Sequence, residues 1–262
     1  MVTALALLVV LLTGAVIPLA VNVVRYKRDK RERGLGRPWH LPQVPVEALD
    51  PVFRPGPLGP TLETEVAFVG RFTIKGVTGG TTDFEAWILA VLSKRARLAF
   101  EFGTATGKTT YLMARNGPPD GRVVTLTLPP EGVSRYTFES GDDAVATRCA
   151  LAESAHARFL YTGTCVESRI TQLYGDSKDF DEGPYVGQCD LVFVDGSHAY
   201  SYVMSDSRKA LRMVAPGGII LWHDYRGPRR CGDVYRALNE LSREIDLVHV
   251  RGTWLVAYRH PA

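Results

Sequence analysis

The chain has 262 residues, of which 45% are hydrophobic, which suits one α/β domain with appended segments. Its formal net charge is +3, but residues 25–37 alone contribute +5, so the rest of the chain carries −2. A body that is not basic argues against a nucleic acid as the main partner. The four cysteines form neither a C-x-x-C pair nor a zinc-ligand spacing, as expected of free thiols in a reducing compartment.

The first segment, residues 2–24, contains no charged side chain. As a helix it would be roughly 35 Å long, enough to cross a hydrocarbon core of about 30 Å. The alternatives are a buried helix and a cleaved signal peptide, but in a signal peptide the basic residues precede the apolar run, whereas here they follow it. Because loops rich in Lys and Arg stay on the cytoplasmic side, we expect residues 1–24 to be a transmembrane anchor in the cell membrane, with the folded part of the chain facing the cytoplasm.

Residues 25–60 are expected to connect this anchor to the folded domain. The basic cluster at residues 25–37 comes first, and a proline-rich stretch follows it. Such a density of proline disfavours helices and central strands and favours extended chain. We therefore expect a linker up to residue 60 and a folded domain over residues 61–262. The prolines of the linker are Pro38, Pro42, Pro45, Pro51, Pro55, Pro57 and Pro60.

Helices and strands alternate in the rest of the chain. Short apolar runs predict buried strands at residues 98–102, 122–128, 170–174, 190–194 and 218–222. Helical patterns occupy residues 83–92, 111–114, 142–159, 202–214 and 234–245. Residues 247–258 are expected to form a terminal hairpin. Short apolar strands separated by helices indicate a parallel sheet that is buried on both faces.

The most informative motif is LAFEFGTATGKTTY at residues 98–111. A strand, a glycine turn and a helix open a nucleotide-binding α/β unit, and Gly103 and Gly107 permit a sharp turn and the close approach of a ligand. Glu101 at the end of the strand suits a ligand with hydroxyl groups, such as a ribose. A phosphate-binding loop needs four residues between its glycines, and here there are three. The dinucleotide fingerprint fails at Ala105, so a purely structural turn is the remaining alternative.

Polar clusters follow the later strands of the predicted sheet. They read GDS at residues 175–177, DGSH at residues 195–198 and HDY at residues 223–225. In open α/β sheets, ligands bind at the carboxyl ends of the strands. The coincidence of polar clusters at several strand ends therefore indicates a ligand site more strongly than any single motif.

The combination of EFGTATGKTT, GDS, DLVFVDGSHAY and PGGIILWHDY resembles the class I S-adenosylmethionine-dependent methyltransferases. More narrowly, it resembles a bacterial group that is similar to metal-dependent O-methyltransferases. The resemblance covers about residues 81–259. It implies a Rossmann-like α/β sheet of seven strands with an antiparallel last strand, here preceded by the predicted N-terminal transmembrane helix, and it implies S-adenosylmethionine as the cofactor.

The resemblance also assigns cofactor contacts to the strand ends. In this fold an acid usually ends the second strand and holds the ribose hydroxyls, whereas this chain has Thr127 there, or Thr125 if the strand ends earlier. A threonine cannot accept two hydrogen bonds as a carboxylate does, so cofactor affinity or ribose geometry is expected to differ. Asp176 and Ser177 are expected near the adenine, although Asp176 could be only a turn residue. The full set of predicted cofactor contacts is Glu101, Gly103, Thr104, Gly107, Thr127, Asp176, Ser177 and Asp195.

Two acids and two histidines are the candidates for the chemistry. Related metal-dependent enzymes place metal ligands at the strand ends of Asp195 and Asp224, and with His223 these form a candidate site for Mg²⁺ or another divalent cation. Histidine prefers softer ions, so His223 could instead be a base or hydrogen-bond to Asp195. In some relatives a histidine at the position of His198 is the suggested base, and an imidazole can accept a hydroxyl proton near neutral pH. We name His198 and Asp195 as candidate catalytic residues, with a helix cap or surface position as the alternative for His198.

The sequence therefore predicts a membrane-anchored methyltransferase that acts on a hydroxyl group of a small-molecule, glycan or lipid-linked acceptor. The alternative is a catalytically inactive module of the same fold that serves as a binding protein or scaffold at the membrane. Thr127 favours the alternative. The retained Glu101, Asp195, His198 and Asp224 favour the enzyme, because a scaffold would not need them.

Overall fold

The computed structural model describes residues 16–27, 39–54, 64–67, 73–74, 77–78, 80–154, 156 and 158–262, in two compact units, 1–39 and 40–262. In the first unit, residues 16–27 form a helix. No helix within the described residues is both long enough and apolar enough to cross a membrane. Most of the predicted transmembrane segment, residues 2–15, lies outside the described residues.

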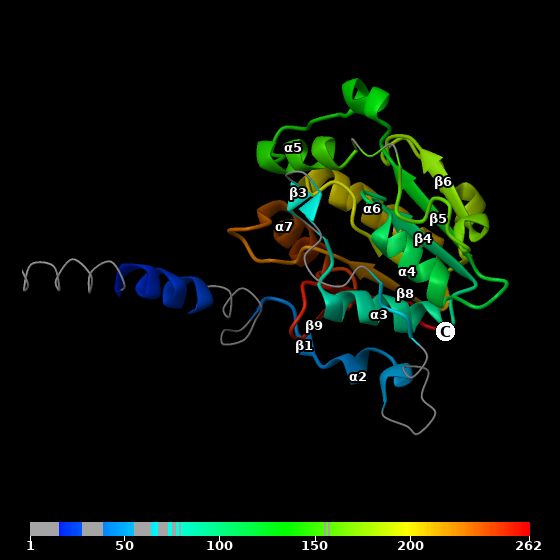
Figure 1. The fold of residues 1–262 in the computed structure, drawn as a ribbon, viewed down its shortest axis with the longest axis horizontal. Helices are drawn as coiled ribbons and strands as arrows, with labels where there is room; N and C mark the ends of the chain where they lie inside the picture. The colour runs from blue at the N-terminus through cyan, green and yellow to red at the C-terminus, as the bar shows by residue number, and fades with distance from the viewer. Residues whose placement is uncertain are drawn as a thin grey trace, which may run out of the picture. The chain divides into compact units, whose positions relative to one another are not determined.

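The second unit is built on one sheet of eight strands in the order β1-β9-β10-β8-β7-β4-β5-β6 (Figure 1). The central strands β8, β7, β4, β5 and β6 are parallel, and β10 is antiparallel to both β8 and β9. The predicted Rossmann-like sheet with an antiparallel last strand is thus confirmed, with eight strands instead of seven. The strands are β1 Gln43–Val44, β4 Leu98–Phe102, β5 Arg122–Thr127, β6 Ile170–Tyr174, β7 Cys189–Val194, β8 Val214–Trp222, β9 Val248–Val250 and β10 Val256–Arg259, and a separate hairpin pairs β2 Thr73–Ile74 with β3 Val77–Thr78.

Helices cover both faces of this sheet, with α3 packed against α4 and α6 packed against α7 (Figure 1). The α-helices are α2 Val46–Leu49, α3 Asp83–Ser93, α4 Lys108–Asn116, α5 Ala144–Glu153, α6 Tyr200–Met213 and α7 Gly232–Leu241. Short 3₁₀ turns are η1 Pro51–Phe53, η2 Pro130–Arg135, η3 Glu167–Arg169 and η4 Gly183–Tyr185. The helix predicted over residues 142–159 is shorter, because Ser154 closes it as the C-cap.

The extra strand comes from the proline-rich stretch, part of which is folded. Residues 43–53 supply β1, α2 and η1, and Leu49 and Phe53 are buried in the main core. Proline is tolerated here because Pro45 is the N-cap of α2 and Pro51 is the first residue of η1. At these positions a backbone N–H would have no partner within the helix, so its loss costs little. Asp50 forms an ion pair with Arg259 of β10, which ties this stretch to the sheet.

The central strands bring five polar strand ends to one edge of the sheet. Their interiors are buried, which explains the uninterrupted apolar runs in the sequence. Phe102 is in register with Leu126 of β5 and with Val194 of β7, and Val194 is in register with Trp222 of β8. The residues that follow these positions therefore meet at the same edge.

Candidate active site

Glu101 lies in β4 and is completely buried. Its Oε2 accepts hydrogen bonds from the hydroxyls of Thr110 and Thr125, the second at 2.6 Å. Its Oε1 is buried without a well-aligned hydrogen bond among the described residues. Burial raises the pKa of Glu101 to about 7, although the hydroxyls of Thr109, Thr110 and Thr125 act in the opposite direction. An oxygen without a hydrogen-bond partner is expected of a carboxylate that binds a ligand.

Gly103 follows β4 at a point where no side chain fits. Its φ is +95°, and a Cβ would lie 2.1 Å from the carbonyl oxygen of Asp195. The glycine is therefore required by the close approach of the β4 and β7 ends, in addition to any approach of a ligand. Gly107 is the N-cap of α4 in the left-handed conformation, with φ of 78°. A Cβ there would lie 2.9 Å from the ring of Tyr161.

Threonine hydroxyls connect the first two strand ends. Thr104 and Thr125 share a hydrogen bond of 2.7 Å, and Gln172 of β6 donates to Thr104 at 3.1 Å. Thr104 is buried and bridges strands, so its predicted cofactor contact would have to be made through its backbone. Thr127 ends β5 and is only partly buried, so it, and not Thr125, occupies the position where the fold usually has an acid.

A pocket opens beside these strand ends. Four of the predicted cofactor contacts line it, namely Gly103, Thr127, Asp176 and Ser177, and its walls include Phe102, Leu126, Leu128, Tyr136 and Tyr202. The space that its walls enclose is about 60 Å³, and it is open to solvent. The other four predicted contacts, Glu101, Thr104, Gly107 and Asp195, lie outside its lining.

Asp206 of α6 also lines this pocket and was missed by the sequence analysis. It is 1% exposed, and burial raises its pKa to about 7, while Ser177 and Lys209 act to lower it. An acid in the middle of an amphipathic helix carries no sequence signal for a site. Its place in the chain alone could not have distinguished it from a surface acid.

The ends of β7 and β8 carry a second, charged cluster around His223. The imidazole is buried, with Nδ1 3.1 Å from Asp195 Oδ1 and 3.4 Å from Asp224 Oδ1. Its Nε2 lies 3.4 Å from Oε2 of Glu85. Burial alone would lower the pKa of His223, but Asp195, Asp224 and Glu85 outweigh it and raise the pKa well above its ordinary value. His223 is therefore held among three carboxylates that favour its charged form.

Glu85 was also missed, although its sequence context contains a signal. It forms a capping box with Thr82 at the start of α3, and its Oε1 accepts a hydrogen bond from the backbone of Trp254 at 2.6 Å. Burial would raise the pKa of Glu85, but His223 and these hydrogen bonds lower it to about 2. The spacing Thr82-x-x-Glu85 predicts a helix cap, but it gives no hint of the contact with His223.

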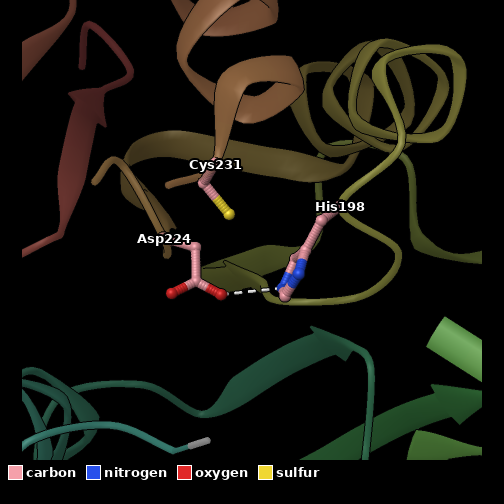
Figure 2. A group of neighbouring side chains, drawn as sticks. All are labelled: His198, Asp224 and Cys231. Carbon is pink, nitrogen blue, oxygen red and sulfur yellow. Dashed lines mark ion pairs between the residues drawn. The ribbon is translucent and has the colours of Figure 1, made fainter. Parts of the chain in front are cut away.

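His198 contacts the other side of Asp224. Figure 2 shows its imidazole pointing at the carboxylate, with Nε2 2.7 Å from Asp224 Oδ2. Arg226 lies 2.6 Å from Asp224 Oδ1 as an ion pair, and its guanidinium stacks 3.9 Å over the ring of Trp254. Burial would raise the pKa of Asp224, but His223, His198 and Arg226 lower it strongly. The carboxylate is thus ionised and oriented toward His198.

The backbone at this edge is strained at two positions. Among the described residues, the non-glycine residues with positive φ are Ala105, at 42°, and Asp224, at 61°. Ala105 lines the pocket and Asp224 carries the charged cluster. Such conformations cost of order 1–3 kcal/mol each and concentrate at functional sites.

The predicted metal ligands come together, but one of them does not fit its role. The ligand atoms of Asp195, His223 and Asp224 lie within 4.8 Å of one another. Both ring nitrogens of His223 face carboxylates, and a metal-binding nitrogen must be deprotonated. A second group, His198, Asp224 and Cys231, is equally compact (Figure 2). There, burial and the charge of Asp224 raise the pKa of the Cys231 thiol, which disfavours the thiolate that a metal needs.

Residues 100–225 match a protein-family model described as a methyltransferase domain. This part of the chain is a methyltransferase domain. The match spans β4 to the end of β8, and therefore contains the pocket, His198, His223 and Asp224. The prediction of a methyltransferase enzyme is confirmed at the level of the family.

No curated protein matches the chain. Solved structures similar to the methyltransferase include the O-methyltransferase TomG from Streptomyces achromogenes, involved in tomaymycin synthesis and in complex with S-adenosylmethionine. It is 20% identical over 70% of this chain and 82% of its own, with a TM-score of 0.45. A putative O-methyltransferase from Klebsiella pneumoniae is 19% identical over 71% of this chain and 84% of its own, with a TM-score of 0.47.

Proposed function

We propose that the methyltransferase transfers a methyl group from S-adenosylmethionine to a hydroxyl oxygen, with His198 as the base. The observation that carries this proposal is the 2.7 Å contact between His198 and Asp224 at the strand edge that also borders the pocket. A histidine oriented by an ionised, buried carboxylate is the usual arrangement for removing a proton from a hydroxyl.

The residues of the first three strand ends fit the cofactor. Gly103, Thr127 and Asp176 line the pocket in which the nucleoside part of the cofactor would lie. The amides at the start of α4 suit a carboxylate. When bound, the cofactor supplies a sulfonium methyl group, and the protein's task is to align an acceptor with it and to exclude water.

The proton transfer follows from the geometry of His198. Its Nε2 donates to Asp224, so Nδ1 accepts the proton. The acceptor oxygen forms a bond to the methyl carbon as the carbon–sulfur bond breaks, and that electron pair stays on sulfur. The hydroxyl proton passes to His198, and Asp224 stabilises the imidazolium that forms. Asp195 acts through His223, which holds the neighbouring carboxylates in place.

No step of this reaction is routed through a divalent cation, because Asp195 and Asp224, the carboxylates that would hold it, both contact His223. The sequence-based prediction of a metal site is tested by chelation. Unchanged methyl transfer in EDTA would support the assignment of His223 as the resident cation. Loss of activity in EDTA and its recovery with Mg²⁺ would restore the metal.

We propose further that residues 1–24 anchor the protein in the cell membrane with the domain in the cytoplasm. The part of this segment that is described, residues 16–24, is helical, and six of its large apolar side chains are exposed there without a polar face. The basic residues that follow it support the cytoplasmic orientation. A protease added to intact cells should leave the domain uncut, and digestion from outside would contradict the orientation. The exposed side chains include Val16, Ile17, Leu19, Val23 and Val24.

The proposed base and the proposed membrane anchor together indicate the chemical class of the acceptor, but not its identity. A base beside the methyl donor suits a hydroxyl, and an anchor favours a lipid-linked acceptor over a soluble small molecule or glycan. An inactive binding module remains the alternative function, favoured by Thr127 at the ribose position.

Calorimetry and a transfer assay on the full chain separate these functions. The enzyme should bind S-adenosylhomocysteine and should transfer a labelled methyl group to one of three probes: a simple phenol, a methyl glycoside or a polyprenyl-linked sugar. Binding without transfer to any probe would support the inactive module. Absence of binding would contradict both.

A further inference from the structure

Asp206 is a buried acid with hydrogen-bonding capacity left over. It lies in the middle of α6, is 1% exposed and lines the cofactor pocket. Its Oδ1 has no well-aligned hydrogen-bond partner among the described residues. A Cβ at Gly196 would lie 3.4 Å from Asp206 Oδ2, so the carboxyl group lies close beneath the backbone that follows β7. A buried oxygen without a partner costs about 1–3 kcal/mol, and a ligand that completes it recovers that cost.

The acid that the sequence assigns to the adenine already has a hydrogen-bond partner on each oxygen. Asp176 Oδ2 accepts a hydrogen bond from the hydroxyl of Tyr202 at 2.7 Å. Its Oδ1 accepts one from the backbone of Lys178 at 2.9 Å. Both oxygens therefore maintain the loop after β6 and the position of Tyr202. Of the two acids in the pocket lining, Asp206 is the one with an oxygen that lacks a well-aligned partner among the described residues.

The pocket around Asp206 combines apolar and aromatic walls with a few polar groups. Phe102, Leu126 and Leu128 supply apolar wall, and the rings of Tyr136 and Tyr202 stack on each other at 4.5 Å and 11°. A flat, mostly apolar ligand with one donor at its edge is complementary to this lining. Burial raises the pKa of Asp206, and its carboxyl group presents an acceptor oxygen whether it is ionised or protonated.

We propose that Asp206 accepts a hydrogen bond from the exocyclic amino group of the cofactor's adenine and selects adenine over purines that lack this group. The inference rests on the proposed function, because it needs the cofactor in this pocket. It makes Asp206 a specificity-determining residue that takes no part in methyl transfer.

The test compares S-adenosylhomocysteine with its analogue that carries hydrogen in place of the 6-amino group. Calorimetry on the full chain should show about tenfold to hundredfold tighter binding of the amino compound, the range that a buried hydrogen bond supplies to specificity. Asp206→Leu should bring the ratio of the two affinities close to one. Asp206→Asn keeps an acceptor oxygen at the same place and should keep the preference. Asp179→Leu, which removes an exposed acid from the loop after β6, is the matched control and should keep the wild-type ratio.

A wild-type ratio near one would overturn the inference, as would a folded Asp206→Leu protein with the wild-type ratio. If Asp206→Leu does not fold, absence of the preference in the wild type or in Asp206→Asn would still overturn the inference, because both must prefer the amino compound. Failure of the wild type to bind either compound would instead overturn the proposed function. A purely structural Asp206 would lower stability in its variants while leaving the ratio unchanged.

Discussion

The two halves of the functional edge are stabilised by different interactions. At the ends of β4, β5 and β6, neutral groups predominate: threonine hydroxyls, glycine backbone and a carboxyl group whose pKa is raised to about 7. At the ends of β7 and β8, ionised groups predominate, with His223 among Glu85, Asp195 and Asp224. Burial raises the pKa of the carboxyl groups in both halves. Only the second half has positive charges nearby that keep its acids ionised.

This difference suits the two tasks of a methyltransferase, which are to bind its cofactor and to hold a base beside the acceptor. A cofactor that carries a positive sulfonium must be bound and released, which favours shape and a few unsatisfied acceptors over a fixed array of charges. A base must be held in one orientation and one protonation state, which favours ion pairs that do not rearrange. The comparison predicts that substitutions in the first half change folding and affinity, whereas those in the second half change the rate.

The largest expected effect is at Gly103. Gly103→Ala places a Cβ against the Asp195 carbonyl and forces an L residue to φ of +95°. We expect a loss of more than about 4 kcal/mol in the free energy of unfolding, which would leave little folded protein. The control is Gly163→Ala, where φ is +78° but nothing lies within 4 Å, and only about 1 kcal/mol should be lost. Equal losses in urea denaturation would show that the approach of β4 to β7 imposes no constraint.

Glu101→Gln should change the pH dependence of stability. The pKa of Glu101 rises from 4.5 to about 7 on folding, so the native state holds a proton that the unfolded state releases between these values. Wild-type stability therefore falls as pH rises from 4.5 to 7, by about 3 kcal/mol from this group. The neutral Gln removes that loss. The stability of the variant relative to wild type should thus increase by this amount between pH 4.5 and pH 8. A constant difference in chemical denaturation across this range would contradict a buried, protonated Glu101.

The smallest expected effect is at Thr127. Thr127→Asp restores a carboxylate at the end of β5, where it can accept both ribose hydroxyl protons. Affinity for S-adenosylhomocysteine should increase about tenfold, by roughly 1.4 kcal/mol. Thr127→Asn is the control, because it has a similar shape without the charge and should give a smaller gain. Weaker binding by Thr127→Asp in calorimetry would show that the ribose does not lie at this strand end.

The sequence predicted the strands better than the ends of the helices. The observed bounds of β4 and β6 are those predicted, because apolar runs bounded by turns leave little freedom. β1 was not predicted, since two residues between prolines carry no strand signal until β9 is present to pair with them. The strand-end motifs placed Asp195, His198, His223 and Asp224 together.

What the sequence could not give is the environment of each acid. Glu85 and Asp206 lie in helices and reach the site through tertiary packing, which no local pattern encodes. For the same reason, the sequence alone does not distinguish the role of His198 from that of His223. Both are histidines next to an acid in a strand-end motif, and only the three carboxylates around His223 distinguish a fixed cation from a base.

The central claim is tested most directly by His198→Ala, with methyl transfer to the acceptor found among the three probes and affinity for S-adenosylhomocysteine measured on the same protein. The single-turnover rate should fall by about two to four powers of ten, the usual share of general base catalysis, while the affinity stays within about twofold. His260→Ala, near the end of the chain and away from the pocket, should leave both unchanged. A wild-type rate in His198→Ala would contradict the assignment of the base and leave alignment of the substrates as the main source of catalysis.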